Sequence, residues 1–95
     1  MNIIISCSLN PNSNSHQMAK RAQSMATGPC EFIDLKEVTL PLCNGVGPTP
    51  KAVQDLIDKI SQAQSIILAA PVYNYNLNAA AKNLIEWTGK AWNNK

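Results

Sequence analysis

Three short apolar segments recur along the chain, and each is typical of a strand that is buried on both faces. They are Asn2–Cys7, Glu31–Leu35 and Ser65–Pro71. The last one ends at a proline, which cannot continue a central ladder. Between and after these segments, apolar residues are spaced three and four apart, as in helices that bury one face.

The helical pattern occurs three times. The first helix is expected from Ser13 to about Ala26, with Ser13, Asn14 or Ser15 as its N-cap. The last is expected from about Asn78 to Trp92. The predicted inner faces are Met18, Ala22 and Met25 in the first helix; Val53, Leu56, Ile57 and Ile60 in the second; and Leu77, Ala81, Leu84, Ile85, Thr88 and Trp92 in the third.

This alternation predicts an α/β fold, with a parallel sheet between two layers of helices. In such sheets ligands bind beyond the carboxyl ends of the strands, where the strand order reverses. If the order is 2-1-3, the loops that follow the first and third strands lie beside each other. The candidate site is therefore expected in these two loops.

Composition narrows the class of protein. The 95 residues suit one domain, and a net charge of +2 from scattered basic residues gives no nucleic-acid footprint. Three cysteines without a CxxC pair, and a single histidine, argue against a disulfide framework or a zinc site. No apolar stretch approaches the roughly 18 residues that span a bilayer. We expect a soluble cytoplasmic protein that binds neither nucleic acid nor membrane and holds no metal.

The first loop, "SCSLNPNSNS", is unusually rich in neutral hydrogen-bonding side chains. Seven of its ten residues carry a hydroxyl or an amide, and none carries a charge. A loop that enters a helix presents free N–H groups and the positive end of the helix dipole, which suits an anion. A phosphate held without a cation fits a resident cofactor better than a transferred group. The predicted phosphate ligands are Ser8, Asn10, Ser13, Asn14 and Ser15.

Three other phosphate chemistries are excluded by the residues. A low-molecular-weight cysteine phosphatase would need an arginine six residues after Cys7, where Ser13 stands. No G-x-x-x-x-G-K-[ST] motif is present, so the chain is not a P-loop nucleotide hydrolase. The segment "GVGPTP" lacks both a preceding strand and a third glycine, and is expected to be a crossover loop.

The second loop follows the third strand and begins "PVYNYN". Tyrosine and asparagine at a strand end offer flat surfaces and neutral hydrogen bonds, which suit an aromatic ring system. Tyr73 and Tyr75 are two residues apart, so only one of them is expected to face a ligand. His16 is expected on the surface or in a cap, Trp92 in the core or an interface, and Trp87 has no evident chemical role.

Together, "CSLNPNS" and "PVYNYNLNAAAKNLIEW" resemble the two motifs of the NAD(P)H-dependent FMN reductase family, which has a flavodoxin-like fold. The resemblance implies that Ser8, Asn10, Ser13 and Ser15 hold the FMN phosphate. It places Pro71, Val72, Tyr73 and Asn74 along the ribityl chain and isoalloxazine. It implies electron transfer from NAD(P)H through FMN to a quinone, azo compound, metal oxyanion or free flavin, with no catalytic acid or base from the protein.

The sequence departs from this family in places. Asn10 replaces the usual arginine, which removes a positive charge near the phosphate, and Tyr75 replaces a glycine. The family's domain is a doubly wound parallel sheet of five strands, so residues 1–95 would form one incomplete flavodoxin-like domain, the N-terminal portion, with only the first three strands in the order 2-1-3. An edge along "SIILAA" would then be exposed. We expect a homo-oligomer or a complementing C-terminal half, and a flavodoxin-type electron carrier or an inactive fragment remain alternatives.

Overall fold

The computed structural model describes residues 1–95 except residues 11, 39, 46–47, 74–75 and 94–95, and of Tyr73 only the backbone. Its main sheet is parallel and holds β1 (Asn2–Ser6), β2 (Cys30–Asp34) and β3 (Ser65–Ala69). The strand order is β2-β1-β3, so the predicted 2-1-3 order is confirmed. The central strand is the most buried of the three, as expected of a strand with neighbours on both sides.

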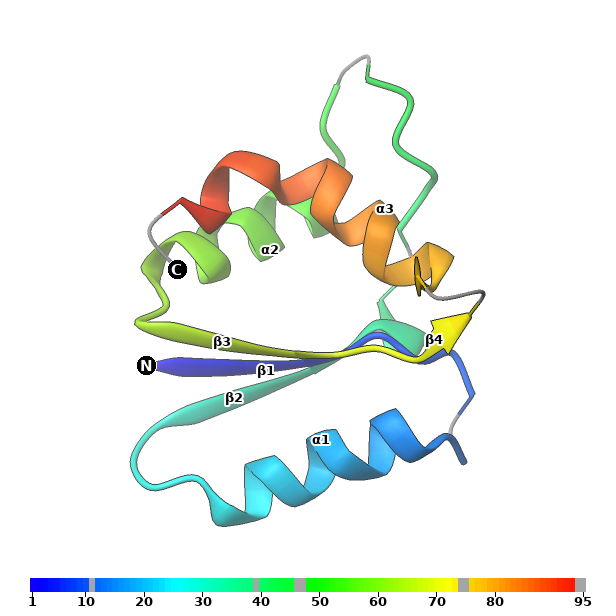
Figure 1. The fold of residues 1–95 in the computed structure, drawn as a ribbon. Coiled ribbons are helices and arrows are strands. Elements are labelled where there is room, and N and C mark those ends of the chain that lie inside the picture. The colour runs from blue at the N-terminus through cyan, green and yellow to red at the C-terminus, as the bar shows by residue number, and fades with distance from the viewer. Residues whose placement is uncertain (11, 39, 46–47, 74–75, 94–95) are drawn as a thin grey trace.

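Helices cover both faces of this sheet (Figure 1). The helix α1 (Asn14–Met25) lies on one face, while α2 (Lys51–Gln62) and α3 (Ala79–Thr88) lie on the other. The three-layer α/β/α arrangement predicted from the sequence is thus confirmed. No helix in the described part of the chain combines the length and apolarity needed to cross a bilayer.

The core follows from the alternation of side chains along β1. Ile3 and Ile5 belong to one buried cluster with Leu56, Ile60 and Leu84, between the sheet and the α2 and α3 layer. Ile4 points to the opposite face, toward α1, and is equally buried. Both faces of the central strand are therefore covered, which explains why Ile3, Ile4 and Ile5 are all apolar.

The predicted inner face of α1 was wrong at two positions. Met18 and Met25 are 70% and 69% exposed, whereas Ala19 is buried at 1% and Ala22 is half-buried. The buried stripe passes through Ala19 and Ala22, whose small side chains let α1 lie close to the sheet. Met25 still lines a hollow on this face of the sheet with Ile4 and Ile67, and it is exposed because no described residue covers that side. Likewise Ile85, expected inside α3, is exposed, because it lies about 100° around the helix from the buried Leu84.

Two local features also differ from expectation. After Pro71, β4 (Val72–Tyr73) and β5 (Asn76–Leu77) pair as an antiparallel hairpin where only a loop was predicted. The last helix ends at Thr88 and continues as a 3₁₀ turn, η2 (Gly89–Trp92), because Gly89 is a poor helix former. A second 3₁₀ turn, η1 (Leu35–Glu37), follows β2.

The outer edge of β3, opposite its edge with β1, is not paired with another strand in the described residues. The strand stands at the end of the sheet, with β1 as its neighbour. Ile67 pairs with Ile4 in the register and therefore points to the α1 face. Its side chain is 51% exposed, whereas Ile4 is 1% exposed. The edge predicted along this segment is thus present, and it is flanked by an exposed apolar side chain.

Candidate functional site

The loops that follow β1 and β3 are joined at the carboxyl end of the sheet. The Cys7 amide donates to the Ala69 carbonyl at 2.8 Å. Asn78, which is 7% exposed, donates from Nδ2 to the Cys7 carbonyl at 2.9 Å. The same Asn78 side chain accepts from the Ala81 amide at 3.2 Å, and so forms the N-cap of α3. One asparagine therefore fixes both loops and the start of the following helix.

The first part of the opening loop is held by its own side chains. Ser8 is buried, and its hydroxyl donates to the Asn10 carbonyl and accepts from the Asn10 amide, both at 3.1 Å. The Asn10 side-chain oxygen accepts from the Asn12 amide at 3.0 Å. These two polar residues shape the loop backbone. Their contact with a phosphate remains a prediction.

The second part of the loop enters α1. Ser13 is the N-cap, because its hydroxyl accepts from the His16 amide at 3.2 Å. This decides among the three cap candidates. The Ser13 and Ser15 hydroxyls are 3.3 Å apart. Asn14 and Ser15 open the helix, where amides have no carbonyl one turn earlier and the helix dipole is positive. The arrangement offers backbone amides and hydroxyls to an anion, without a formal charge.

The third-strand loop is described in part. Pro71 is half-buried and Val72 is 67% exposed. The Tyr73 backbone belongs to β4, where it pairs with Asn76. The Tyr73 side chain, Asn74 and Tyr75 lie outside the described residues. The predicted ring contacts of this loop therefore stay predictions.

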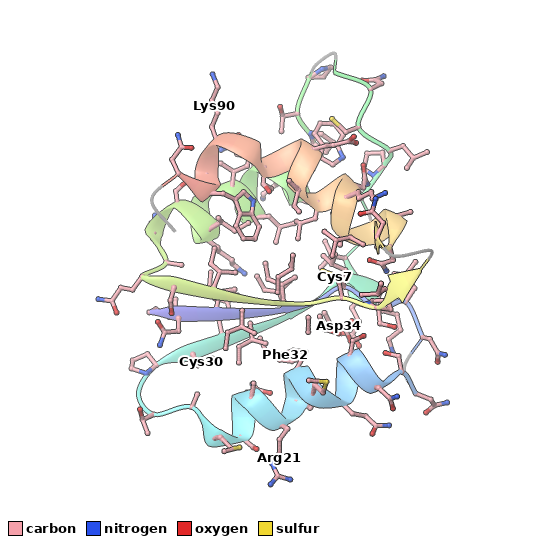
Figure 2. The ribbon with its side chains drawn as sticks, in the orientation of Figure 1. Cys7, Arg21, Cys30, Phe32, Asp34 and Lys90 are labelled. Carbon is pink, nitrogen blue, oxygen red and sulfur yellow. The ribbon has the colours of Figure 1, made fainter. Side chains whose placement is uncertain are left out.

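His16 is part of the packing between α1 and the sheet. Its Nδ1 and the Ser6 hydroxyl share a hydrogen bond of 2.8 Å, and its ring packs against Phe32 in a T-shaped arrangement with 6.0 Å between the ring centroids. Lys20 places its ammonium 4.3 Å from the same Phe32 ring. Figure 2 shows Phe32 between the sheet and α1. His16 is thus more than the surface residue expected, because its side chain joins a strand to a helix.

Cys7 ends the first strand but has none of the properties of a nucleophile. Its side chain is fully buried, and Figure 2 shows it beside the carboxyl end of the sheet. Burial raises the pKa of the Cys7 thiol to about 12, so the thiolate is scarce near neutrality. The structure therefore supports the exclusion of cysteine phosphatase chemistry.

Asn83 and Trp87 were not predicted as part of the site, yet they fasten the loop that crosses from β2 to α2. Asn83 donates to the Pro41 carbonyl at 3.0 Å and accepts from the Cys43 amide at 2.8 Å. Trp87 donates from Nε1 to the same Pro41 carbonyl at 2.7 Å. Both residues lie in the "KNLIEW" segment on which the resemblance rests, which was the available signal. We call residues 41–43 the clamped segment.

An apolar pocket of about 380 Å³ lies between this loop, the opening loop and the start of α3. Its walls are mainly aliphatic, from Leu9, Leu35, Val38, Leu40 and Leu42. Leu9 is shared with the opening loop, since it stands between Ser8 and Asn10. The pocket and the candidate anion site therefore have one wall in common.

Comparison with known proteins gives consistent matches. The family model described as NADPH-dependent FMN reductase matches residues 2–95. An NADPH:quinone oxidoreductase of Arabidopsis thaliana is 36% identical over 64 residues, which are 63% of this chain and 32% of that protein. A protein of Oryza sativa subsp. japonica, named probable NADPH:quinone oxidoreductase 1, is 34% identical over 80 residues, which are 72% of this chain and 41% of that protein.

Among solved structures, FerB of Paracoccus denitrificans, titled a flavoenzyme NAD(P)H:(acceptor) oxidoreductase, superposes with a TM-score of 0.75. Its sequence identity is 30%, and the match covers 90% of this chain and 48% of FerB. The chain thus spans about a third to a half of the length of these proteins.

Proposed function

Because the chain belongs to the NADPH-dependent FMN reductase family, we propose that its opening loop and its third-strand loop bind FMN. The protein is then an oxidoreductase that takes electrons from NAD(P)H and passes them to a small acceptor. The single observation that carries this proposal is the joining of the two loops at one edge of the sheet, through the Asn78–Cys7 hydrogen bond. In sheets of this type that edge is where cofactors bind.

The opening loop fits a phosphate group by the chemistry of its donors. The amides of Asn14 and Ser15 and the Ser15 hydroxyl stand at the positive end of α1. Ser13 holds the helix start in place, while Ser8 and Asn10 hold the turn before it. The loop contributes no cation, so the phosphate would be bound by neutral hydrogen bonds and by the helix dipole.

The third-strand loop is proposed to hold the ring system through Pro71, Val72, Tyr73 and Asn74. The exposed Val72 offers an apolar contact beside the hairpin. When bound, FMN supplies the two-electron chemistry between NAD(P)H and the acceptor. The protein's own part is to bind and orient the cofactor. His16 is engaged with Ser6, and burial raises the pKa of the Cys7 thiol to about 12, so neither is assigned a part in proton transfer.

Quinones are the acceptor class that we propose first. Two of the matched proteins carry quinone oxidoreductase in their names. The pocket beside the opening loop is mainly aliphatic, which suits an apolar acceptor better than a metal oxyanion. Action in the cytoplasm belongs to the same proposal, and is supported by three free cysteines.

NADPH oxidation tests the activity directly. The chain, mixed with FMN, NADPH and a quinone, is expected to oxidise NADPH faster than free FMN does under the same conditions. The rate should saturate with the quinone, because the reaction proceeds at a binding site. A rate equal to that of free FMN would contradict the proposed activity. Saturable FMN binding with that same rate would instead indicate an electron carrier.

A second polypeptide segment is proposed to cover β3. The strand edge and the exposed Ile67 leave apolar surface of the kind that parallel sheets bury. A second copy of this chain, or a segment equivalent to the remaining length of the matched proteins, would cover it. Sedimentation equilibrium is expected to give a mass above the 10.3 kDa of one chain. A monomer at all concentrations would exclude the second copy.

A further inference from the structure

His16 bridges the end of β1 and the start of α1. Its Nδ1 and the Ser6 hydroxyl share a hydrogen bond of 2.8 Å, and its backbone amide donates at 3.2 Å to the Ser13 hydroxyl that caps the helix. Ser6 is fully buried, so its hydroxyl depends on the protein for a hydrogen-bond partner. The opening loop is therefore closed at its base, because one residue is bonded both to the last position of the strand and to the cap of the helix.

The imidazole is also held by packing. Its ring forms a T-shaped contact with Phe32 of β2, with 6.0 Å between the ring centroids. Lys20, about one turn later on α1, places its ammonium 4.3 Å from the centroid of the same ring. Phe32 is level with Ile4 in the register and Ser6 lies two residues after Ile4, so all three point to the α1 face. The orientation of the His16 side chain is thus set by two strands.

The place of the first turn of α1 decides where its free amides point. The amides of Asn14 and Ser15 have no carbonyl one turn earlier, and they are the donors that the loop offers to a phosphate. His16 follows them directly, so a link from its side chain to β1 limits the movement of the same turn. Hydrogen bonds weaken steeply with misalignment, and a binding group that its surroundings do not hold loses affinity. Recognition of the phosphate should therefore depend on a residue that need not touch it.

We propose that His16 is a positioning residue for the FMN phosphate, and that it acts by holding the first turn of α1 against Ser6. The proposal rests on the proposed function and adds to it a residue from outside the predicted ligand set. It separates two roles within one turn of helix. Asn14 and Ser15 present the donors, and His16 keeps them in place.

FMN and riboflavin titrations of the full chain test this role, because the two flavins differ only by the phosphate. His16→Ala removes the hydrogen bond to Ser6 but keeps the backbone amide that donates to Ser13. It is expected to weaken FMN binding about fivefold and to change riboflavin binding by less than about twofold. His16→Asn places an amide near the position of Nδ1, and should bring the FMN affinity back to within about twofold of the wild type. Quenching of flavin fluorescence gives the affinities.

Two further changes separate positioning from stability. Ala19→Gly replaces a buried alanine on α1, about one turn after His16, and is expected to lower the thermal midpoint of unfolding while leaving the FMN-to-riboflavin affinity ratio unchanged. Ser6→Ala removes the same hydrogen bond from the strand side, is expected to act as His16→Ala does, and decides alone if His16→Ala does not fold. The double variant should bind FMN about as weakly as either single variant, because both act through one bond.

Three results would overturn the positioning role. The first is an FMN-to-riboflavin affinity ratio that both His16→Ala and Ser6→Ala leave as in the wild type. The second is a ratio that Ala19→Gly lowers equally, or that His16→Asn does not restore. The third is additive losses in the double variant. The wild type separates this proposal from the FMN site itself. Equal affinity for the two flavins, or no binding, rejects the phosphate site and His16 with it, whereas discrimination that His16→Ala retains rejects only the role of His16.

Discussion

Replacing Ser15 with aspartate is expected to weaken FMN binding about 30-fold, which corresponds to roughly 2 kcal/mol. Ser15 is in the first turn of α1, where we place the phosphate. A carboxylate there would repel the phosphate directly. It would also favour the fold, because a negative charge near a helix N-terminus contributes about 0.3–1 kcal/mol of stability. A loss of binding could therefore not be attributed to unfolding. Fluorescence quenching of FMN measures the change.

The matched control is Ser15→Asn, which changes the side chain without adding charge. It is expected to weaken FMN binding by less than about fivefold, because the backbone amides of Asn14 and of residue 15 remain. Riboflavin, which has no phosphate, should bind both variants alike. Equal FMN affinity in Ser15→Asp and the wild type would place the phosphate elsewhere.

Replacing Asn78 with alanine is expected to lower the free energy of unfolding by about 2–4 kcal/mol. Of this, about 1 kcal/mol reflects the lost N-cap of α3. The rest reflects the Cys7 carbonyl, which loses its side-chain donor in a buried setting. FMN affinity should also fall, because this residue joins the two loops. Urea unfolding, followed by tryptophan fluorescence, gives the change in stability.

Two further variants separate the contribution of the helix cap from that of the hydrogen bond to Cys7. Asn78→Ser can still cap the helix but cannot reach the Cys7 carbonyl in the same way, so about half of the loss is expected. Asn76→Ala replaces an exposed asparagine whose side-chain oxygen accepts only from the adjacent Leu77 amide, and should cost less than about 0.5 kcal/mol. If Asn78→Ala unfolds within about 0.5 kcal/mol of the wild type, the asparagine does not hold the loops together.

The strands could be predicted because apolar runs are local in sequence, whereas the order 2-1-3 came from the resemblance to a flavodoxin-like fold. Apolar runs such as Asn2–Cys7 indicate buried strands, and right-handed crossovers then limit the order. The faces of helices were harder to predict. A stripe through Met18, Ala22 and Met25 and a stripe through Ala19 and Ala22 both have helical spacing, and the structure buries the second.

The long-range hydrogen bonds of the site could not be predicted from spacing. Asn78 reaches Cys7 across 71 residues, and Asn83 reaches Pro41 across 42. An asparagine in a sequence gives no sign of which distant backbone it will meet. The resemblance marked Asn83 and Trp87 as members of a motif, and the structure supplies their physical role as a clamp on the crossover loop.

In the opening loop, the number of hydroxyl and amide side chains overstated how many of them are free to bind a phosphate. Seven hydroxyl and amide side chains suggested a phosphate-binding loop. In the structure, however, Ser8, Asn10 and Ser13 form hydrogen bonds with backbone groups of the loop and of the first turn of α1. Their number is therefore partly explained by the turn that they build. What remains for a phosphate is the start of α1, with its backbone amides and the Ser15 hydroxyl.

The most direct test of the FMN site is a paired titration of the chain with FMN and with riboflavin, followed by quenching of flavin fluorescence. The account predicts saturable binding of one FMN per chain, and at least about tenfold weaker binding of riboflavin, because the phosphate is held at the start of α1. Equal affinity for the two flavins, or no saturation by a chain whose spectrum shows it to be folded, would contradict the claim that these two loops form an FMN site.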